Sequence, residues 1–363
     1  MHTYVIAELG VNHNGKIDLA KELIDSAVYA GADAVKFQLF STEQLVSDDA
    51  PLASYQTENV EKVISQKQLL NDLQLTESQF LELYDYSMRR GVDFLCTPFD
   101  VDSLKFLVED LKLKKIKIAS PDITNSQLLF NVGRYNVDVI LSTGMCLLAD
   151  IEFALGVLAT GFITPKVYPT EKNIVDNLRN IASQKLLKEK VTLLHCNSDY
   201  PTKPADVNLN AIKKLSEVFG LKVGYSDHTK IIEVAMGAVA LGARVIEKHL
   251  TINNSLPGPD HKASIEPKVF KEMVTKIRIM EEILGEFSKL PTSSEMKNKT
   301  LLRRSIVARK YIAKGELFTE NNLMATRPGT GISAKYFYDY IGEVASENYK
   351  EGQAISALSG LIK

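Results

Sequence analysis

Eight short apolar runs recur along the chain, and most are separated by stretches with the amphipathic spacing of helices. The runs are residues 4–10, 34–38, 93–99, 116–120, 138–144, 191–197, 222–228 and 244–250. Helical spacing is clearest in residues 19–30, 77–90, 102–111 and 151–159. Buried parallel strands have continuous apolar sequences of this kind. Eight strand–helix units over about 280 residues predict an α/β fold of the (β/α)8 TIM-barrel type.

A doubly wound open sheet is the alternative fold. It would have fewer strands and a glycine-rich first turn that binds a dinucleotide. The first turn here reads Glu8-Leu-Gly-Val-Asn-His-Asn-Gly15, and its two glycines do not have the spacing of that fingerprint. The barrel is therefore the preferred prediction.

The chain is expected to contain two domains. The barrel is predicted for residues 1–286, a linker for 287–300 and a compact α+β module for 301–363, which is small for an isolated core. The long segment 39–71 is expected to cap the catalytic mouth. Residues 161–190 are expected to be an insertion on the opposite side, where they contribute stability or oligomer contacts.

Composition excludes several kinds of partner. The 363 residues carry a net charge of −2 with scattered basic residues, which argues against nucleic-acid or membrane binding. No apolar run reaches transmembrane length. Cys96, Cys146 and Cys196 lie in apolar contexts without metal-ligand spacing, so we expect packing residues in a reducing cytoplasm.

Two of the six histidines stand at the ends of predicted strands that follow one another. His228 ends one strand and His249 the next, with Asp227, Glu247 and Lys248 beside them. Two imidazoles with open positions can hold a divalent ion that polarises a carbonyl group. The residues alone leave the metal open, although imidazole ligands favour zinc or iron. The alternative is a pair of hydrogen-bonded strand-end histidines with no ligand.

Other strand ends carry lysines and hydroxyl groups. Lys36, Lys117 with Ser120, and Ser142-Thr-Gly144 together predict a cradle for phosphate or carboxylate. A buried ammonium group requires an anionic partner, which in the alternative interpretation is a carboxylate such as Glu8 or Glu247. The remaining polar strand-end residues are Gln38, Thr97, His195, Asn197 and Ser226.

The loop of residues 257–264 follows the last strand. Its prolines make it stiff, and Asp260, His261 and Lys262 form a polar trio that no structural requirement explains. We expect the trio to point outward and contact a substrate.

Several motifs together resemble one known family, the sialic acid synthases. The motifs are Ala7-Glu-Leu-Gly-Val-Asn-His-Asn-Gly15, Val35-Lys-Phe-Gln38, Ser142-Thr-Gly-Met145, Gly224-Tyr-Ser-Asp-His228, Glu247-Lys-His249 and Gly258-Pro-Asp-His-Lys-Ala-Ser264. Enzymes of this family condense phosphoenolpyruvate with an N-acetylated amino sugar to form nine-carbon 2-keto sugar acids. The C-terminal module resembles the family's antifreeze-like SAF domain, a β-clip fold.

The resemblance implies roles for individual residues. It implies that His228 and His249 are catalytic residues that bind Mn²⁺ or Mg²⁺, and that Glu8 handles protons near the reacting carbons. The residues implied for phosphoenolpyruvate binding are Lys36, Lys117, Ser120, Ser142 and Ser226. Those implied to face the sugar or the water shell of the metal are Gln38, Tyr200 and Asp260. It further implies a homodimer with swapped SAF domains, in which Arg327 contacts the N-acetyl group of the sugar.

One departure from the family pattern leaves the sugar open. Many members carry Ser-Gly-Glu where this chain has Ser120-Pro-Asp122, so Asp122 is a shorter candidate for the sugar contact. N-acetylmannosamine, giving N-acetylneuraminate, is the default substrate. A 2,4-diacetamido-2,4,6-trideoxy hexose, giving legionaminate or pseudaminate, is the alternative.

Two other functions remain as alternatives. A Schiff-base aldolase would use Lys36, Lys117 or Lys248 as the nucleophile and need no metal, so the histidine pair argues against it. A carbohydrate- or ice-binding protein on an inert barrel would not need ionisable residues at the strand ends.

Overall fold

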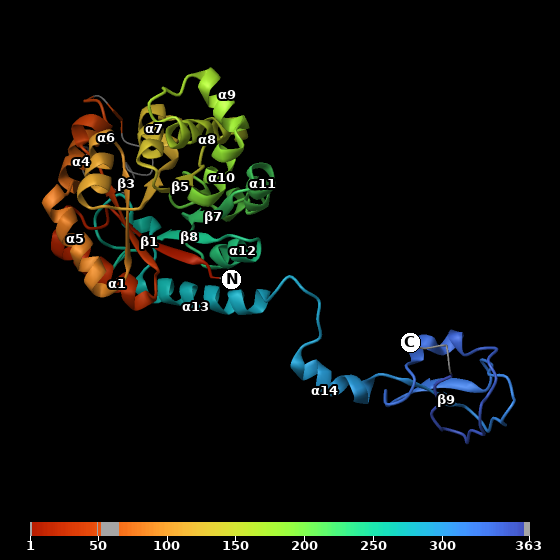
Figure 1. Cartoon of the computed structure of the whole chain (residues 1–363). Helices are drawn as coiled ribbons and strands as arrows, with labels where there is room; N and C mark the ends of the chain where they lie inside the picture. Colours follow the sequence, from red (N-terminus) through yellow and green to blue (C-terminus); the bar gives the residue numbers. More distant parts are fainter. Residues whose placement is uncertain (1, 49, 52–64, 359–363) are drawn as a thin grey trace. The chain divides into compact units, whose positions relative to one another are not determined.

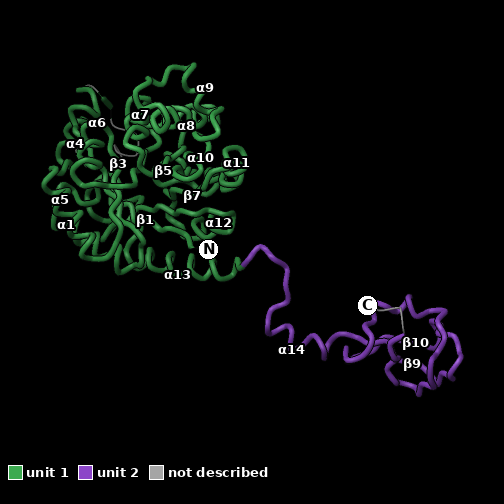
Figure 2. Tube along the Cα trace, viewed as in Figure 1, with its two compact units in different colours: residues 1–285 green, residues 286–363 purple. Residues whose placement is uncertain are grey.

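The computed structural model describes residues 2–48, 50–51 and 65–358. The chain divides into two compact units, residues 1–285 and 286–363 (Figure 2). This division falls next to the predicted end of the barrel domain. Each unit has its own buried apolar core.

Eight parallel strands form the centre of the first unit (Figure 1). They are β1 (Tyr4–Gly10), β2 (Ala34–Leu39), β3 (Asp93–Pro98), β4 (Lys115–Ile118), β5 (Asp138–Ser142), β6 (Val191–Cys196), β7 (Lys222–Asp227) and β8 (Val245–His249). Their order in the sheet is β3-β2-β1-β8-β7-β6-β5-β4, and β3 also lies against β4. The sheet therefore closes, which confirms the predicted (β/α)8 barrel over the open sheet.

Helices cover the outside of this barrel (Figure 1). They are α1 (Ile17–Ala30), α5 (Glu77–Arg90), α6 (Val101–Lys105), α7 (Ser126–Tyr135), α8 (Leu148–Ile163), α11 (Asn210–Phe219), α12 (Glu233–Ala240) and α13 (Pro267–Leu284). Local sequence sets their ends: Thr76 caps α5 with Gln79 in a capping box, and Gly91 ends it in a left-handed conformation. The helix predicted for residues 102–111 is α6 followed by a π-helical turn, Phe106–Asp110.

The two long segments contain helices of their own. Within residues 39–71 lie α2 (Thr42–Leu45) and α4 (Gln66–Leu73), while residues 49 and 52–64 of that prediction lie outside the described part. Within residues 161–190 lie α9 (Glu171–Arg179) and α10 (Ile181–Lys190), which both pack against α8. This packing agrees with a contribution of that segment to stability.

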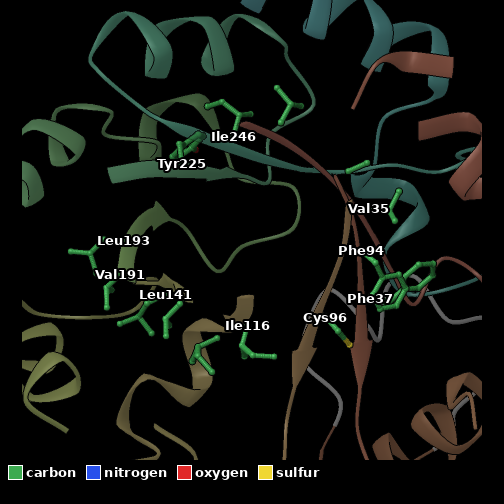
Figure 3. Packing of buried hydrophobic residues seen from close by; sticks show 14 of the residues in the cluster. Val35, Phe37, Phe94, Cys96, Ile116, Leu141, Val191, Leu193, Tyr225 and Ile246 are labelled. Carbon is green, nitrogen blue, oxygen red and sulfur yellow. The ribbon is translucent and has the colours of Figure 1, made fainter. Parts of the chain in front are cut away.

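Side chains alternate between the inner and outer faces of the strands, and this explains why a polar mouth forms above an apolar base. Outward residues such as Val35, Phe37 and Phe94 pack in the large core beneath the helices (Figure 3). Inward residues Ile6, Ala34, Leu95, Ile140, Leu194 and Val245 form a second apolar cluster inside the barrel. Side chains alternate between the two faces of a strand, so the next inward positions lie two residues further on. Most of those positions are polar, and they lie at the carboxyl ends of the strands.

The second unit is a small module built on two antiparallel strands, β9 (Ser305–Ala308) and β10 (Leu323–Thr326). Its core contains Ile306, Ile312, Phe318, Leu323, Tyr340 and Tyr349. The predicted linker is largely a helix, α14 (Ser293–Leu302), because Thr292 and Glu295 form a capping box that the linker prediction overlooked. Across both units, none of the described helices is long and apolar enough to span a membrane.

Candidate active site

A cavity of about 620 Å³ lies at the carboxyl ends of the barrel strands, where TIM-barrel enzymes have their active sites. Strand ends, the loops that follow them, and α2 and α4 line it. The predicted site residues in its lining are Glu8, Lys36, Gln38, Lys117, Ser120, Asp122, Ser142, Tyr200, Ser226, His228, His249 and Asp260. Folding therefore brings together residues that lie up to about 250 positions apart in the sequence.

Glu8 and Lys36 form a buried ion pair between the neighbouring strands β1 and β2. The Glu8 carboxylate also accepts a hydrogen bond from Gln38 Nε2 at 2.8 Å, and Lys36 Nζ donates to Thr97 Oγ1 at 3.2 Å. Burial raises the pKa of Glu8, although Lys36 acts in the opposite direction. Burial lowers the pKa of Lys36, but Glu247 and Glu8 outweigh it and leave that pKa raised. Lys36 is therefore a cation beside a carboxyl group with an increased affinity for protons.

Lys117 and Glu247 form a second charged group on the floor of the cavity. Lys117 Nζ donates to Ser142 Oγ at 2.8 Å and lies 3.7 Å from Oε1 of Glu247. Ser226 Oγ donates to the same Glu247 oxygen at 2.8 Å, and Lys36 Nζ lies 3.8 Å from Glu247 Oε2. Burial raises the pKa of Glu247, but Lys117 and Lys36 outweigh it and hold this pKa at about 2.

The strand-end lysines were predicted either to form an anion cradle or to pair with carboxylates, and each prediction describes part of the structure. Each ammonium group has a carboxylate neighbour, as the ion-pair alternative expected. Each also has a hydroxyl neighbour that faces the same cavity, as the anion cradle expected. Two ammonium groups and several hydroxyl groups converge on one small volume, and this set of donors can bind an oxyanion.

His228 and His249 lie side by side, with their ring centroids 5.5 Å apart. Burial lowers the pKa of both imidazoles to about 3, so both rings are neutral at physiological pH. His228 Nδ1 lies 2.5 Å from the carbonyl oxygen of Asn197, and this contact requires the proton to be on Nδ1. Nε2 of His228 is then left with a lone pair. The ring of Tyr200 packs 4.2 Å from that of His228.

Asp260 lies beside the second imidazole. Its Oδ2 is 3.8 Å from Nδ1 of His249, a nitrogen without a hydrogen-bond partner in the described part of the chain. Burial and then Glu8 raise the pKa of Asp260 to about 7, while Lys36 opposes the shift.

The two imidazoles have the protonation state that a divalent cation requires of its histidine ligands. A histidine binds a metal as a neutral imidazole, through a nitrogen with a free lone pair. The other ring nitrogen usually donates a hydrogen bond, for example to a carbonyl oxygen, which fixes the orientation of the ring. Among the described residues, no group of three or more His, Cys, Asp or Glu side chains could hold a metal ion. His228 and His249 could supply two imidazole ligands and leave the other positions of a cation to water or substrate. The divalent cation stays a prediction.

Ser120 and Asp122 lie in the turn after β4. Gly144 N donates to Ser120 Oγ at 3.0 Å, and Cys196 Sγ lies 3.1 Å from the same oxygen. Gly144 follows β5, and a Cβ there would lie 2.6 Å from Ser198 Oγ and 2.8 Å from Ser120 Oγ, so a larger residue would displace these hydroxyl groups. Asn125 Nδ2 donates to Asp122 Oδ1 at 3.0 Å, and burial raises the pKa of this carboxyl group.

Arg327 lies in the second unit, where it follows β10 and is exposed. Its Nε donates a hydrogen bond of 2.9 Å to the carbonyl oxygen of Leu302. Its contact with the sugar stays a prediction.

Three polar residues expected at or beside the mouth face the outside of the barrel instead: Lys248, Asp227 and His195. Lys248 Nζ forms an ion pair of 2.7 Å with Asp227 and donates to the carbonyl oxygen of Thr229 at 2.6 Å. His195 Nε2 lies 2.8 Å from the carbonyl oxygen of Val207. Each of the three is one residue out of phase with the inward positions of its strand, which explains the error. Because Lys248 does not line the cavity, it is a poor candidate for an aldolase nucleophile.

The polar trio of the loop of residues 257–264, Asp260, His261 and Lys262, also lies only partly in the cavity. Asp260 lines the cavity, whereas His261 and Lys262 are absent from its described lining. His261 is completely buried, with Nδ1 2.7 Å from Thr251 Oγ1 and Nε2 3.2 Å from Asn14 Oδ1. The expectation that all three point outward toward a substrate is therefore wrong for His261, which joins two loops.

Two features of the cavity were predicted only in part. Glu247 was named as one alternative partner for a strand-end lysine, and the structure places it near both lysines. Its position two residues before His249 gives it the same inward phase, but the lysines that it meets depend on how the neighbouring strands are placed. Segment 39–71 was predicted to cap the mouth, and α2 and α4 of that segment do line the cavity. The apolar character of this lining was not predicted, because its leucines have the spacing of ordinary core residues.

Comparison with known proteins gives matches over nearly the whole chain. Residues 23–289 match the NeuB family, and residues 303–358 match the SAF domain. The N,N'-diacetyllegionaminic acid synthase of Campylobacter jejuni is 42% identical over 353 residues, which is 97% of this chain and 98% of that protein. The N,N'-diacetyllegionaminic acid synthase of Legionella pneumophila is 39% identical over 355 residues, 98% of this chain and 94% of that protein. The crystal structure of N-acetylneuraminic acid synthetase from Leptospira borgpetersenii, 33% identical, has a TM-score of 0.67 and covers 82% of this chain and 90% of that one.

These matches confirm the expected class of enzyme, a phosphoenolpyruvate-dependent transferase that forms a carbon–carbon bond, and they confirm the SAF domain. They support N-acetylmannosamine less well than the diacetamido-trideoxy hexose as the substrate. The two relatives at 42% and 39% identity are legionaminic acid synthases, whereas the N-acetylneuraminic acid synthetase is 33% identical. The chain belongs to the NeuB family, which it matches over residues 23–289, and it carries a SAF domain after that region.

Proposed function

We propose that the protein condenses phosphoenolpyruvate with a 2,4-diacetamido-2,4,6-trideoxy hexose to give N,N'-diacetyllegionaminate and phosphate. The observation that carries the proposal is the convergence of two buried lysines and two neutral imidazoles on one cavity. The choice of sugar is supported by the 42% and 39% identity to the two legionaminic acid synthases. Three unpaired cysteines support a reducing, cytoplasmic location.

The polar floor of the cavity supplies the groups that hold phosphoenolpyruvate. Its phosphate and carboxylate carry several negative charges, for which Lys36 and Lys117 provide cations, and Ser142 and Ser226 provide directed hydroxyl donors. Ser120 offers a further hydroxyl group at the same floor. Burial strengthens each of these contacts because little water competes for them.

The reaction then has three bond changes. The methylene carbon of phosphoenolpyruvate attacks the C1 aldehyde carbon of the open-chain sugar and forms the new carbon–carbon bond. Water adds at the carbon that was C2 of phosphoenolpyruvate, and phosphate leaves from the resulting tetrahedral intermediate. The carboxyl group of Glu8, with its raised pKa and its contact to Lys36, can transfer the protons that these steps require.

We assign the divalent cation, Mn²⁺ or Mg²⁺, to His228 and His249. When bound, it supplies a Lewis acid that polarises the aldehyde oxygen. The protein's own contribution is to hold these rings in the ligand form: the Asn197 carbonyl orients His228, and Tyr200 packs against both rings. Gln38, Asp122 and Asp260 are the polar lining residues assigned to the sugar and to the water around the cation.

We further propose a homodimer in which each SAF domain supplies Arg327 to the partner's barrel. The family resemblance supports this arrangement, and so does the modest core of the second unit, nine buried apolar residues. Mixing His228→Ala with Arg327→Ala tests it at a sugar concentration far below the KM expected for Arg327→Ala, where each variant alone has little activity. In a mixed dimer one site would combine an intact barrel with an intact SAF domain, so random mixing restores about a quarter of wild-type activity. A mixture as inactive as its components contradicts the swap.

The experiment that tests the proposed reaction compares two sugars. The diacetamido-trideoxy hexose and N-acetylmannosamine are each offered with phosphoenolpyruvate and Mn²⁺, and phosphate release is measured together with the product mass. The expected result is a higher kcat/KM with the diacetamido sugar. Preference for N-acetylmannosamine would establish the default substrate instead.

A further inference from the structure

One side of the active-site cavity is apolar. The end of β2 and the helices α2 and α4 contribute Phe40, Leu45, Val46, Leu69, Leu70 and Leu73, which we call the apolar wall. Phe99, which follows β3, packs edge-on against Phe40 with ring centroids 6.3 Å apart. Phe40, Leu69 and Leu73 belong to a small hydrophobic cluster that is separate from the barrel cores, and Leu45, Leu70 and Phe99 pack against it. The wall is therefore a built surface of the cavity.

The wall cannot satisfy polar groups of a ligand. None of its six side chains has a hydrogen-bond donor or acceptor, and the polar residue that α4 contributes to the described lining is Gln66, at the start of the helix. A hydroxyl group pressed against it would lose water without gaining a partner, at a cost of roughly 1–3 kcal/mol. A methyl group placed there gains about 0.8 kcal/mol for each carbon removed from water.

The wall also lacks positive charge. Among the described residues of the cavity lining, the lysines are Lys36 and Lys117, and both lie on the floor. The nearest cation in sequence, Lys67 of α4, is engaged by Glu43 and Asp48 at 2.8 Å and 2.7 Å. A sugar phosphate directed at the wall would have no cation to neutralise it.

Two candidate sugars differ in the groups that they would present. N-acetylmannosamine carries one methyl group, on its acetamide, and hydroxyl groups at C4 and C6. The diacetamido-trideoxy hexose replaces the C4 hydroxyl with a second acetamide and the C6 hydroxyl with hydrogen. Its far end therefore carries two additional methyl groups.

We infer that the apolar wall is the subsite that selects the 6-deoxy, 4-acetamido end of the sugar. The inference rests on the proposed function and identifies residues that set its specificity. With the reacting aldehyde at the histidines, the polar floor holds phosphoenolpyruvate and the wall is left for the methyl-bearing end. Each misplaced hydroxyl group or lost methyl contact changes kcat/KM by about one order of magnitude.

Leu70→Gln tests the wall, because this half-buried leucine lines the cavity and can accept a polar side chain of similar size. The test measures kcat/KM for both sugars at saturating phosphoenolpyruvate, and KM for phosphoenolpyruvate. The expected result is a tenfold or greater fall in the preference for the diacetamido sugar, with KM for phosphoenolpyruvate unchanged. Val46→Thr, a nearly isosteric change, should shift the preference in the same direction. It serves if Leu70→Gln folds poorly.

Two control variants accompany the test. Leu70→Met keeps the wall apolar and should keep the wild-type preference. Leu81→Gln makes the same polar change at an exposed leucine of α5 outside the described lining and should have no effect. If wild type prefers the diacetamido sugar but Leu70→Gln and Val46→Thr leave the preference unchanged, the role of the wall in sugar selection is refuted and the proposed function stands. If wild type prefers N-acetylmannosamine, both are overturned.

Discussion

Asp227 and Lys248 form a buried ion pair on the outer side of β7 and β8, with 2.7 Å between Oδ2 and Nζ. The residue after each is one of the two cavity histidines, His228 and His249. Thr229 ties the pair further, since its N donates to Asp227 Oδ1 at 2.9 Å and its carbonyl oxygen accepts from Lys248 at 2.6 Å. The pair therefore fixes the strand ends from which both imidazoles project.

Removal of one charge from this pair is predicted to destabilise the barrel strongly. Lys248→Met leaves the Asp227 carboxylate buried without a cation, which typically costs about 3–5 kcal/mol. Urea unfolding followed by circular dichroism measures the loss. The double variant Asp227→Leu, Lys248→Met should recover most of it, because no unpaired charge remains. A Lys248→Met protein that unfolds at the wild-type urea midpoint would show that the pair contributes little.

Lys117→Met is predicted to weaken phosphoenolpyruvate binding selectively. The change removes the ammonium group that donates to Ser142 Oγ and lies 3.7 Å from Glu247. Loss of a charged contact of about 3 kcal/mol corresponds to a fall of about 100-fold in kcat/KM. Initial rates should show a raised KM for phosphoenolpyruvate and a sugar KM within about twofold of wild type. Lys115→Met, at the other end of β4, is the matched control.

His228→Ala and His249→Ala are predicted to abolish metal-dependent turnover while the fold remains intact. Isothermal titration with Mn²⁺ should detect binding to wild type and a loss of about tenfold or more in affinity for each variant. Circular dichroism provides the check on folding. Wild-type activity that survives exhaustive chelation would contradict the assignment of these residues to a metal.

Acid is predicted to destabilise the barrel through His261. Burial lowers the pKa of this imidazole from 6.5 to about 4. Between these two pH values the unfolded chain binds more protons than the folded one, so this stability is present above pH 6.5 and is lost as the pH falls toward 4. The contribution is about 1–3 kcal/mol. Thermal unfolding at pH 7.5 and 4.5 should show a smaller pH effect in His261→Gln than in wild type, and equal effects would refute the prediction.

The repeating strands made the barrel predictable, and the barrel made the site predictable. Parallel strands of a closed sheet end on one rim, so the sequence alone predicts that Glu8, Lys36 and His249 lie at one mouth, as they do in the structure. Inward or outward direction depends on register, and a shift of one residue reverses it. Lys248 and His195 were misplaced for this reason.

Other features depend on contacts that no local pattern encodes. The carboxylate of Glu247 between two lysines requires three strands to be placed relative to one another. The apolar wall has the composition of core, and its exposure to a cavity follows only from where α2 and α4 pack. Arg327 lies in a separate unit, so the role proposed for it at a partner's barrel would depend on assembly rather than on the sequence around it.

Arg327→Ala is predicted to impair use of the sugar far more than use of phosphoenolpyruvate. The guanidinium group is exposed in its own unit, and a hydrogen bond from Nε to the Leu302 carbonyl holds it in position. A charged hydrogen bond to an acetamide oxygen is worth about 1.5–3 kcal/mol, so the sugar KM should rise by about 10- to 100-fold. Steady-state kinetics with each substrate varied in turn provides the measurement. Arg309→Ala, an exposed arginine of the same unit, should leave both constants at wild-type values. Equal increases in both KM values for Arg327→Ala would refute a role specific to the sugar.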